Sequence, residues 1–115
     1  MFEDQEDVFY YLTLQNEAYA MPPMPAGAEE GILKGLYRFR AAEGTGDRAQ
    51  ILGSGSILNE ALRAQKLLSE RFHVAADVWS ATSYTQMRRD ALSVERWNRH
   101  HPESAPRIPY VVRTL

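Results

Sequence analysis

Five stretches of the chain carry the apolar pattern of β-strands. Residues 8–14 are β-branched and aromatic without a breaker, which is typical of a strand covered on both faces. Residues 36–40 alternate apolar side chains with arginine, which indicates a strand at a solvent-facing edge. Residues 49–52 form a short apolar run before a glycine turn, and residues 73–82 form the next strand. The final stretch, residues 110–115, also reads as the beginning of a strand.

Two longer stretches have the periodicity of amphipathic helices, and residues 28–34 predict a short helix. The helix predicted over residues 57–72 has one apolar stripe, made of Leu58, Ala61, Leu62, Leu68 and Phe72. Ser83 and Gln86 form a capping box that begins a further helix within residues 84–99. The apolar residues of that helix are Met87, Leu92, Val94 and Trp97.

The order strand, helix, strand over residues 49–80 predicts a βαβ unit. Strands joined by such a crossover are parallel, and the connection is right-handed. The edge strand near Tyr37 precedes the unit, and the second long helix follows it. The pattern therefore predicts an α/β fold class with parallel strands and a right-handed βαβ crossover.

A proline-rich segment separates the first predicted strand from the rest of the chain. Pro22, Pro23 and Pro25 forbid regular structure and favour an extended path, which indicates an ordered connector between two bodies. We expect the large apolar side chains of this connector to fill a gap between packed elements rather than to bind a ligand. These side chains are Tyr19, Met21 and Met24.

The strand-like run at residues 110–115 bears on how much of a protein this chain represents. A length of 115 residues suits one domain. A sheet that stopped inside an apolar run would have an unpaired edge. We therefore expect the chain to be an excised piece of a larger protein that is marginally stable or self-associating on its own.

The glycine turn at residues 53–56, with the sequence Gly-Ser-Gly-Ser, is a candidate phosphate-binding loop because it leads from a strand into a helix. A dinucleotide-binding fingerprint needs a third glycine where Leu58 stands, and a P-loop needs a following lysine that is absent. We expect a tight turn in which the Ser56 hydroxyl caps the helix. Asp77 lies 22 positions after Gly55, close to the spacing of a ribose-binding carboxylate, but a solvent-facing or sheet-end position explains it better.

Other candidate chemistry is sparse. The three histidines, His73, His100 and His101, lack the spacing of a zinc site, and the last two suit a helix C-terminus. The charged residues of the second long helix interleave at helical spacing, which predicts a solvated face with ion pairs. The sequence shows no recognisable catalytic arrangement of serine, histidine and an acidic residue.

The composition of the chain excludes several classes of binding partner. The chain has 13 basic and 15 acidic side chains, a net charge of −2 and a pI near 5.9, which argues against a nucleic-acid partner. It has no cysteine, so no disulfide or thiolate site is possible. The acidic N-terminus does not resemble a signal peptide, and no apolar run is long enough to span a membrane. We expect a cytoplasmic protein with no membrane partner.

Several quoted stretches together resemble one family. In chain order they are DVFYYLTLQNEAYAMPPMP, GAEEGILKGLYRF, QILGSGSIL, AADVWSATSYTQMRRDAL and ERWNRHHP. They resemble the thiamine-diphosphate-dependent pyruvate dehydrogenase component of the homodimeric bacterial type. The resemblance covers essentially the whole chain but only a small part of a subunit of that family.

The resemblance implies a partial transketolase-like C-terminal domain. Residues 1–27 would be the tail of the pyrimidine-binding domain with its proline-rich connector, and residues 28–115 the first part of the C-terminal domain. The Gly-Ser-Gly-Ser turn would then belong to a sheet that supports the dimer, not to the site of the cofactor diphosphate.

The resemblance also implies an activity for the parent protein. That activity is decarboxylation of pyruvate on thiamine diphosphate with Mg²⁺, followed by acetylation of a lipoyl group. The implied partners are a second identical subunit and the lipoyl acyltransferase. The family's metal-binding signature is absent from this sequence, so we expect no catalytic, cofactor-binding or metal-binding residues and no activity in the chain alone.

One motif of the family can be carried over residue by residue. Asn16, Glu17 and Tyr19 match a segment that lines the active-site region, whereas Ala18 and Ala20 depart from it and weaken any proton-transfer role there. Two other readings remain open. The chain could be a free-standing nucleotide-binding, anion-binding or interaction module, or a transketolase relative that acts on sugar phosphates.

Overall fold

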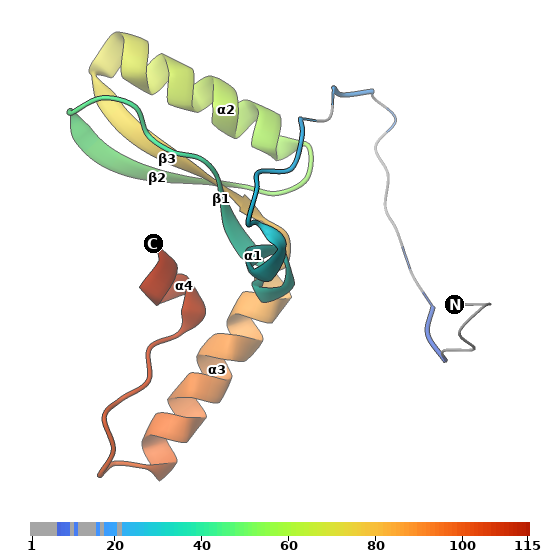
Figure 1. The fold of residues 1–115 in the computed structure, drawn as a ribbon, viewed down its shortest axis with the longest axis vertical. Helices are drawn as coiled ribbons and strands as arrows, with labels where there is room; N and C mark the ends of the chain where they lie inside the picture. Colours follow the sequence, from blue (N-terminus) through green and yellow to red (C-terminus); the bar gives the residue numbers. More distant parts are fainter. Residues whose placement is uncertain (1–6, 10, 12–15, 17, 21) are drawn as a thin grey trace.

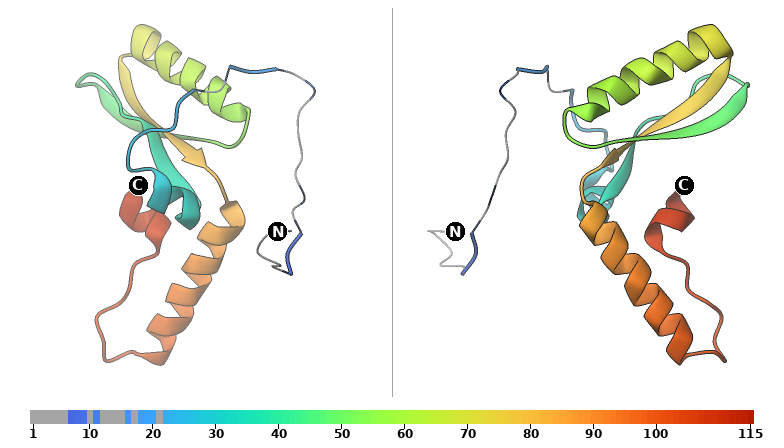
Figure 2. Two further views of the ribbon diagram at one scale, coloured as in Figure 1. Left: turned by 45° about the vertical axis from the view of Figure 1, so that its right-hand side comes forward. Right: turned by 180° about the vertical axis from the view of Figure 1, so that it is seen from behind.

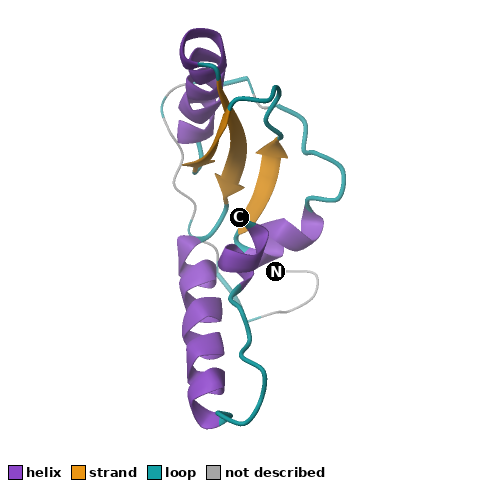
Figure 3. Cartoon of the chain, turned by 90° about the vertical axis from the view of Figure 1, so that its left-hand side faces the viewer, coloured by secondary structure: helices purple, strands orange, loops and turns teal. Residues whose placement is uncertain are grey.

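A computed structural model describes residues 7–9, 11, 16, 18–20 and 22–115 of the chain (Figure 1). A three-stranded sheet lies between helices, and a long helix projects away from it (Figures 1 and 3). The elements in chain order are α1 (Glu29–Lys34), β1 (Leu36–Arg40), β2 (Asp47–Gly53), α2 (Ile57–Leu67), η1 (Leu68–Phe72), β3 (Val74–Ala81), α3 (Tyr84–His100) and α4 (Tyr110–Thr114).

The sheet has the order β1-β3-β2, with β3 in the centre. Strand β2 pairs with β3 in parallel, from Asp47 opposite Val74 to Gly53 opposite Ser80. This pairing confirms the predicted strand, helix, parallel strand unit. Strand β1 pairs with β3 antiparallel, with Leu36 opposite Ala81, so the sheet is mixed.

Strand β3 is central, and apart from Asp77 its side chains are small or apolar on both faces. Every residue from 75 to 81 is buried, which is the pattern of a strand covered on both sides. Helix α2 covers one face of β2 and β3, whereas α4 lies on the opposite side (Figures 1 and 2). The Gln65 side chain of α2 reaches the sheet and donates to the Ala76 carbonyl at 2.8 Å.

The core lies where β1, β3, α3 and α4 meet. Its buried members are Leu36, Trp79, Ala81 and Met87, with Leu52, Tyr110 and Val111 packed against them. The Tyr110 hydroxyl donates to the Leu36 carbonyl at 2.9 Å and ties α4 to β1. Burying each large apolar side chain contributes roughly 1.5–3 kcal/mol, so this small cluster is a main source of stability.

Two glycines allow close packing at turns. Gly35 has a φ of +93° and ends α1, and its carbonyl accepts the N–H groups of Thr82 and Ser83. A Cβ on Gly53 would lie 2.9 Å from the Leu58 Cα, so only glycine lets the end of β2 approach the start of α2 this closely.

Helix α3 begins as predicted. The Ser83 hydroxyl accepts the Gln86 N–H at 3.1 Å, which satisfies one free donor of the first turn. The Ser83 N–H donates to the Gly35 carbonyl at 3.2 Å, so this cap also fixes the junction between α1 and β1.

The strand predicted over residues 110–115 is wrong, because Tyr110–Thr114 is the helix α4. Pro109 takes the N-cap position, the Tyr110 N–H donates to the Asp90 carboxylate at 2.6 Å, and the Arg113 N–H returns to the Pro109 carbonyl at 3.0 Å. This acidic cap from α3 favours a helical turn over extended backbone. The expectation of a sheet that stops in a strand therefore loses its basis.

The helix predicted over residues 57–72 is correct in place but not in its last turn. Residues Leu68–Phe72 form the π-helix η1, and Phe72 is 66% exposed rather than part of the apolar stripe. A π-helix adds a residue to the turn and so rotates the following side chains away from a 3.6-residue stripe. Ala61 is buried as predicted, and Leu58, Leu62 and Leu68 are half-buried.

The N-terminal segment lacks the predicted strand and the predicted gap-filling side chains where the structure describes it, although residues 22–25 have no regular structure, as predicted. Val8, Phe9 and Tyr11 are exposed and outside any strand, and the other residues of that predicted strand lie outside the described residues. Tyr19 and Met24 are about half exposed, so they do not fill a gap between packed elements, and Met21 lies outside the described residues. A strand covered on both faces needs neighbouring surfaces, and the exposed side chains of Val8, Phe9 and Tyr11 lack them.

Candidate functional site

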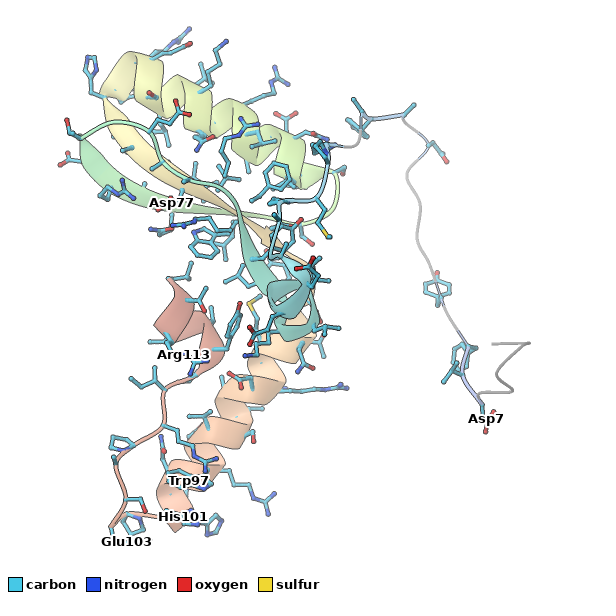
Figure 4. All side chains as sticks on the ribbon, viewed as in Figure 1. Asp7, Asp77, Trp97, His101, Glu103 and Arg113 are labelled. Carbon is cyan, nitrogen blue, oxygen red and sulfur yellow. The ribbon has the colours of Figure 1, made fainter. Side chains whose placement is uncertain are left out.

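The most developed polar cluster surrounds Asp77, in the middle of β3. Asp77 is only 4% exposed, so the expectation of a solvent-facing or sheet-end position is wrong (Figure 4). The reason is that residues from β2 and from the segment after β1 cover the carboxylate and supply its hydrogen bonds. A buried carboxylate is stable only with such partners.

Three donors converge on the Asp77 carboxylate. The Ala42 N–H donates to Oδ1 at 2.8 Å. The Arg48 guanidinium and the Gln50 amide donate to Oδ2 at 3.1 and 3.3 Å. Gln50 stands directly opposite Asp77 in the parallel register, so both side chains point to the same face of the sheet.

The network continues into the core through Trp79. The Trp79 indole N–H donates to the Gln50 side-chain carbonyl, so the amide of Gln50 bonds on both of its ends. The Arg38 guanidinium lies 6.0 Å from the Trp79 ring centroid, at the limit of a cation–π contact. One network thus connects all three strands.

The surroundings of Asp77 keep it ionised. Burial raises the pKa of its carboxyl group. The hydrogen bonds from the Ala42 N–H and the Gln50 amide and the charges of Arg48 and Arg38 lower this pKa by more, so the pKa lies below its ordinary value. Both carboxylate oxygens are engaged. Asp77 is therefore a structural anion that joins strands, and it has little capacity to accept a substrate proton.

The turn at residues 53–56 does not form a phosphate site. The N–H groups of Ile57, Leu58 and Asn59 donate to backbone carbonyls three residues earlier, at 3.1–3.2 Å. These are the groups that an anion at a helix N-terminus would need. Ser56 stands at the N-cap as predicted, but its backbone is helical and its side chain makes no capping bond, so the predicted hydroxyl cap is wrong.

Asp77 and this turn are separate features. Asp77 pairs with Gln50, three residues before Gly53, which places the carboxylate about 10 Å along the sheet from the turn. A ribose-binding role for Asp77 next to a diphosphate at the turn therefore has no support in the geometry.

The active-site-lining residues expected from the family lie in the N-terminal segment. Asn16 and Tyr19 are exposed. Glu17 lies outside the described residues. The role expected for these three residues stays a prediction.

The histidines have structural positions. His73 ends η1 with a φ of +54°. His101 caps the C-terminus of α3, where its Nδ1 lies 2.8 Å from the Trp97 carbonyl and its ring stacks on Trp97 at 4.4 Å (Figure 4). The Arg107 guanidinium lies 3.8 Å from the Trp97 ring centroid. These contacts hold together the loop between α3 and α4.

A thiamine diphosphate site does not fit the described residues. Among them, no three His, Cys, Asp or Glu side chains are grouped to hold a metal ion, and Mg²⁺ binding of a diphosphate needs oxygen ligands. The turn most like an anion site has its N–H groups engaged by its own backbone.

In the described part of the chain, no helix is long and apolar enough to cross a membrane.

Comparison with known proteins gives the relationship of the chain. The transketolase-like TK C-terminal domain family matches residues 35–110. The pyruvate dehydrogenase E1 component of Pseudomonas aeruginosa is 50% identical over 116 residues, covering 100% of this chain and 13% of the relative. The E1 component of Escherichia coli strain K12 is 48% identical over 113 residues, covering 98% of this chain and 13% of the relative.

A relative with lower identity gives the same result. The pyruvate dehydrogenase E1 component of Mycobacterium tuberculosis is 44% identical over 115 residues, covering 98% of this chain and 12% of the relative. The chain spans about 13% of the length of the curated relatives it matches. The resemblance to the pyruvate dehydrogenase component and the transketolase-like α/β fold class are thereby confirmed, and the chain belongs to the family of transketolase-like C-terminal domains.

Proposed function

We propose that the chain acts as a non-catalytic structural segment of a pyruvate dehydrogenase E1 component. The observation that carries the proposal is the identity of 44–50% to E1 components over 98–100% of the chain. The polar cluster at Asp77 supports it, because a fully engaged carboxylate at the centre of a sheet suits a scaffold better than a catalytic site.

The parent protein would decarboxylate pyruvate on thiamine diphosphate with Mg²⁺ and acetylate a lipoyl group. Its partners would be a second identical subunit and the lipoyl acyltransferase, in the cytoplasm. Residues 1–27 would close the pyrimidine-binding domain, and residues 28–115 would begin the C-terminal domain. Asn16, Glu17 and Tyr19 would line the active-site region from the connector side.

A chimera tests this proposal. The matching segment of the Pseudomonas aeruginosa E1 component is replaced by this chain, and pyruvate decarboxylation, acetyl transfer to a lipoyl domain and subunit mass are measured. We expect a dimer with both activities. The control chimera carries the corresponding segment of a transketolase and should lose acetyl transfer. A chimera with this chain that assembles as a dimer yet decarboxylates no pyruvate would overturn the proposal.

The isolated chain supplies a second test. Incubated with pyruvate, thiamine diphosphate and Mg²⁺, it should release no CO₂, because the described residues provide no cofactor site. A thermal-shift assay with ATP, NAD or inorganic phosphate should leave the melting temperature unchanged, since ligand binding raises it by linkage. A nucleotide-dependent rise would instead favour the free-standing binding module.

A further inference from the structure

Helix α3 has a free basic side, which we call the arginine row: Arg88, Arg89 and Arg96, with Leu92 between them. All three arginines are exposed, and none has a hydrogen bond or ion pair within the described part of the chain. Residues spaced three and four positions apart on a helix share one side. Leu92 is 46% exposed on that side.

The other side of α3 is already occupied. Met87 is buried in the core, and Asp90 accepts the Tyr110 N–H. Trp97 and Asn98 hold the segment that returns along the helix to α4 (Figures 1 and 2). The arginine row thus makes none of these contacts within the described part of the chain.

The charge of the row is not balanced locally. Glu95, the acidic neighbour on α3, pairs with Arg99 at 2.8 Å, and Asp90 serves as the cap of α4. The chain as a whole has a net charge of −2. Three unpaired guanidinium groups on one helix therefore form a basic patch on a protein that is otherwise acidic.

We propose that the arginine row binds an acidic protein segment that presents carboxylates around an apolar side chain. Guanidinium groups match carboxylates with paired hydrogen bonds, which gives geometric specificity as well as attraction. Leu92 supplies the apolar contact at the middle of the row. This binding goes beyond the proposed function and requires no catalytic activity.

A nucleic acid fits the row less well. Three arginines neutralise few phosphates, and the net negative charge of the chain opposes a polyanion.

The test uses the 115-residue chain and three fluorescein-labelled probes. The first is a helical peptide with glutamates at i and i+4 around a leucine, the second has glutamine in place of every glutamate, and the third is a short DNA duplex. Binding is followed by fluorescence anisotropy at low and at raised salt. We expect the acidic peptide alone to bind, with an affinity that falls as salt screens the charges.

Matched variants locate the site. Arg96→Glu should weaken binding of the acidic peptide about threefold to tenfold, as expected for reversing one charge at an exposed contact. Arg71→Glu makes the same change of charge at another exposed arginine and should leave binding unchanged. Leu92→Ala should weaken binding, whereas Leu33→Ala, at an exposed leucine on α1, should not.

Each variant is first checked for an unchanged unfolding midpoint, and Arg96→Gln replaces Arg96→Glu if the latter does not fold. Absence of binding to the acidic peptide overturns the proposal. So does an equal loss in Arg96→Glu and Arg71→Glu, which would indicate only long-range attraction. Tighter binding of the duplex than of the peptide would assign the row to a nucleic acid instead.

Discussion

Gln50 and Asp77 stand opposite each other on neighbouring parallel strands, and the Gln50 amide donates to the Asp77 carboxylate at 3.3 Å. The other end of the same amide accepts the Trp79 indole N–H. A single glutamine thus connects the buried anion of the sheet to the largest side chain of the core. Changes at this network should be felt in the stability of the whole fold.

Replacing Asp77 with alanine should lower the free energy of unfolding by about 2–3 kcal/mol, because the Ala42 N–H and the Gln50 amide lose their acceptor. Urea denaturation of the two proteins measures the difference. Asp47→Ala is the control, since Asp47 is exposed at the start of β2, and it should cost less than about 0.5 kcal/mol. Equal costs for the two variants would show that the network stabilises nothing.

The stabilisation from Asp77 should depend on pH. Its folded-state pKa is lowered, so the unfolded state binds the proton more readily, and the contribution is fully present above the ordinary value of about 3.9. It is lost as the pH falls through the folded-state pKa. The unfolding free energies of the wild type and Asp77→Asn should therefore converge as the pH is lowered from 5 toward about 2. A gap that stays constant over this range would contradict the lowered pKa.

Gly53→Ala should destabilise the protein by about 1–3 kcal/mol, the usual cost of overpacking. The added Cβ would lie 2.9 Å from the Leu58 Cα and 3.2 Å from the Ala61 Cβ. Thermal unfolding checks the effect. The control is Gly55→Asn, because Gly55 has open space around it and asparagine tolerates its positive φ. The prediction fails if Gly53→Ala melts at the wild-type temperature.

Asn98→Ala should free the loop between α3 and α4. The Asn98 amide donates to the Arg107 carbonyl at 2.9 Å, and its carbonyl accepts the Arg107 N–H at 2.8 Å. These exposed bonds contribute about 0.5–1.5 kcal/mol each. Hydrogen exchange at the Arg107 and Tyr110 amides should become faster. Asn98→Asp keeps the acceptor and should show an intermediate rate, and unchanged exchange in Asn98→Ala would rule out the clamp.

The parallel pair and α3 could be predicted because their signals are local. An apolar run, a glycine turn and an amphipathic stretch define β2 and α2, and the Ser83 cap marks the start of α3. Residues 110–115 could not be read correctly. Their side chains favour a strand, but the segment is helical because Asp90, twenty residues earlier, accepts the Tyr110 N–H. No local pattern reveals a partner at that distance.

The Asp77 network was missed for a related reason. Arg48 and Gln50 are polar at alternate positions of β2, which predicts a solvent-exposed face when this strand is considered without its neighbours. Only the register, with Gln50 opposite Asp77, shows that polar side chains of two strands meet on one face, where Arg48 and Gln50 cover the Asp77 carboxylate. Alternating polar residues on β2, together with a single carboxylate in the apolar strand after the crossover, are the signal that could have indicated it.

The order β1-β3-β2 has a consequence for how the protein is made. Strands β1 and β2 leave the ribosome before their partner, since within the described part of the chain each pairs with β3. Leu36 has to wait for Ala81, and Asp47 for Val74, so both pairings close long loops of chain. Until residue 81 has emerged, strands β1 and β2 of the nascent chain are unpaired and helix α2 has no completed sheet to cover. In this state the exposed strand edges and apolar side chains offer the largest surface for a chaperone to bind.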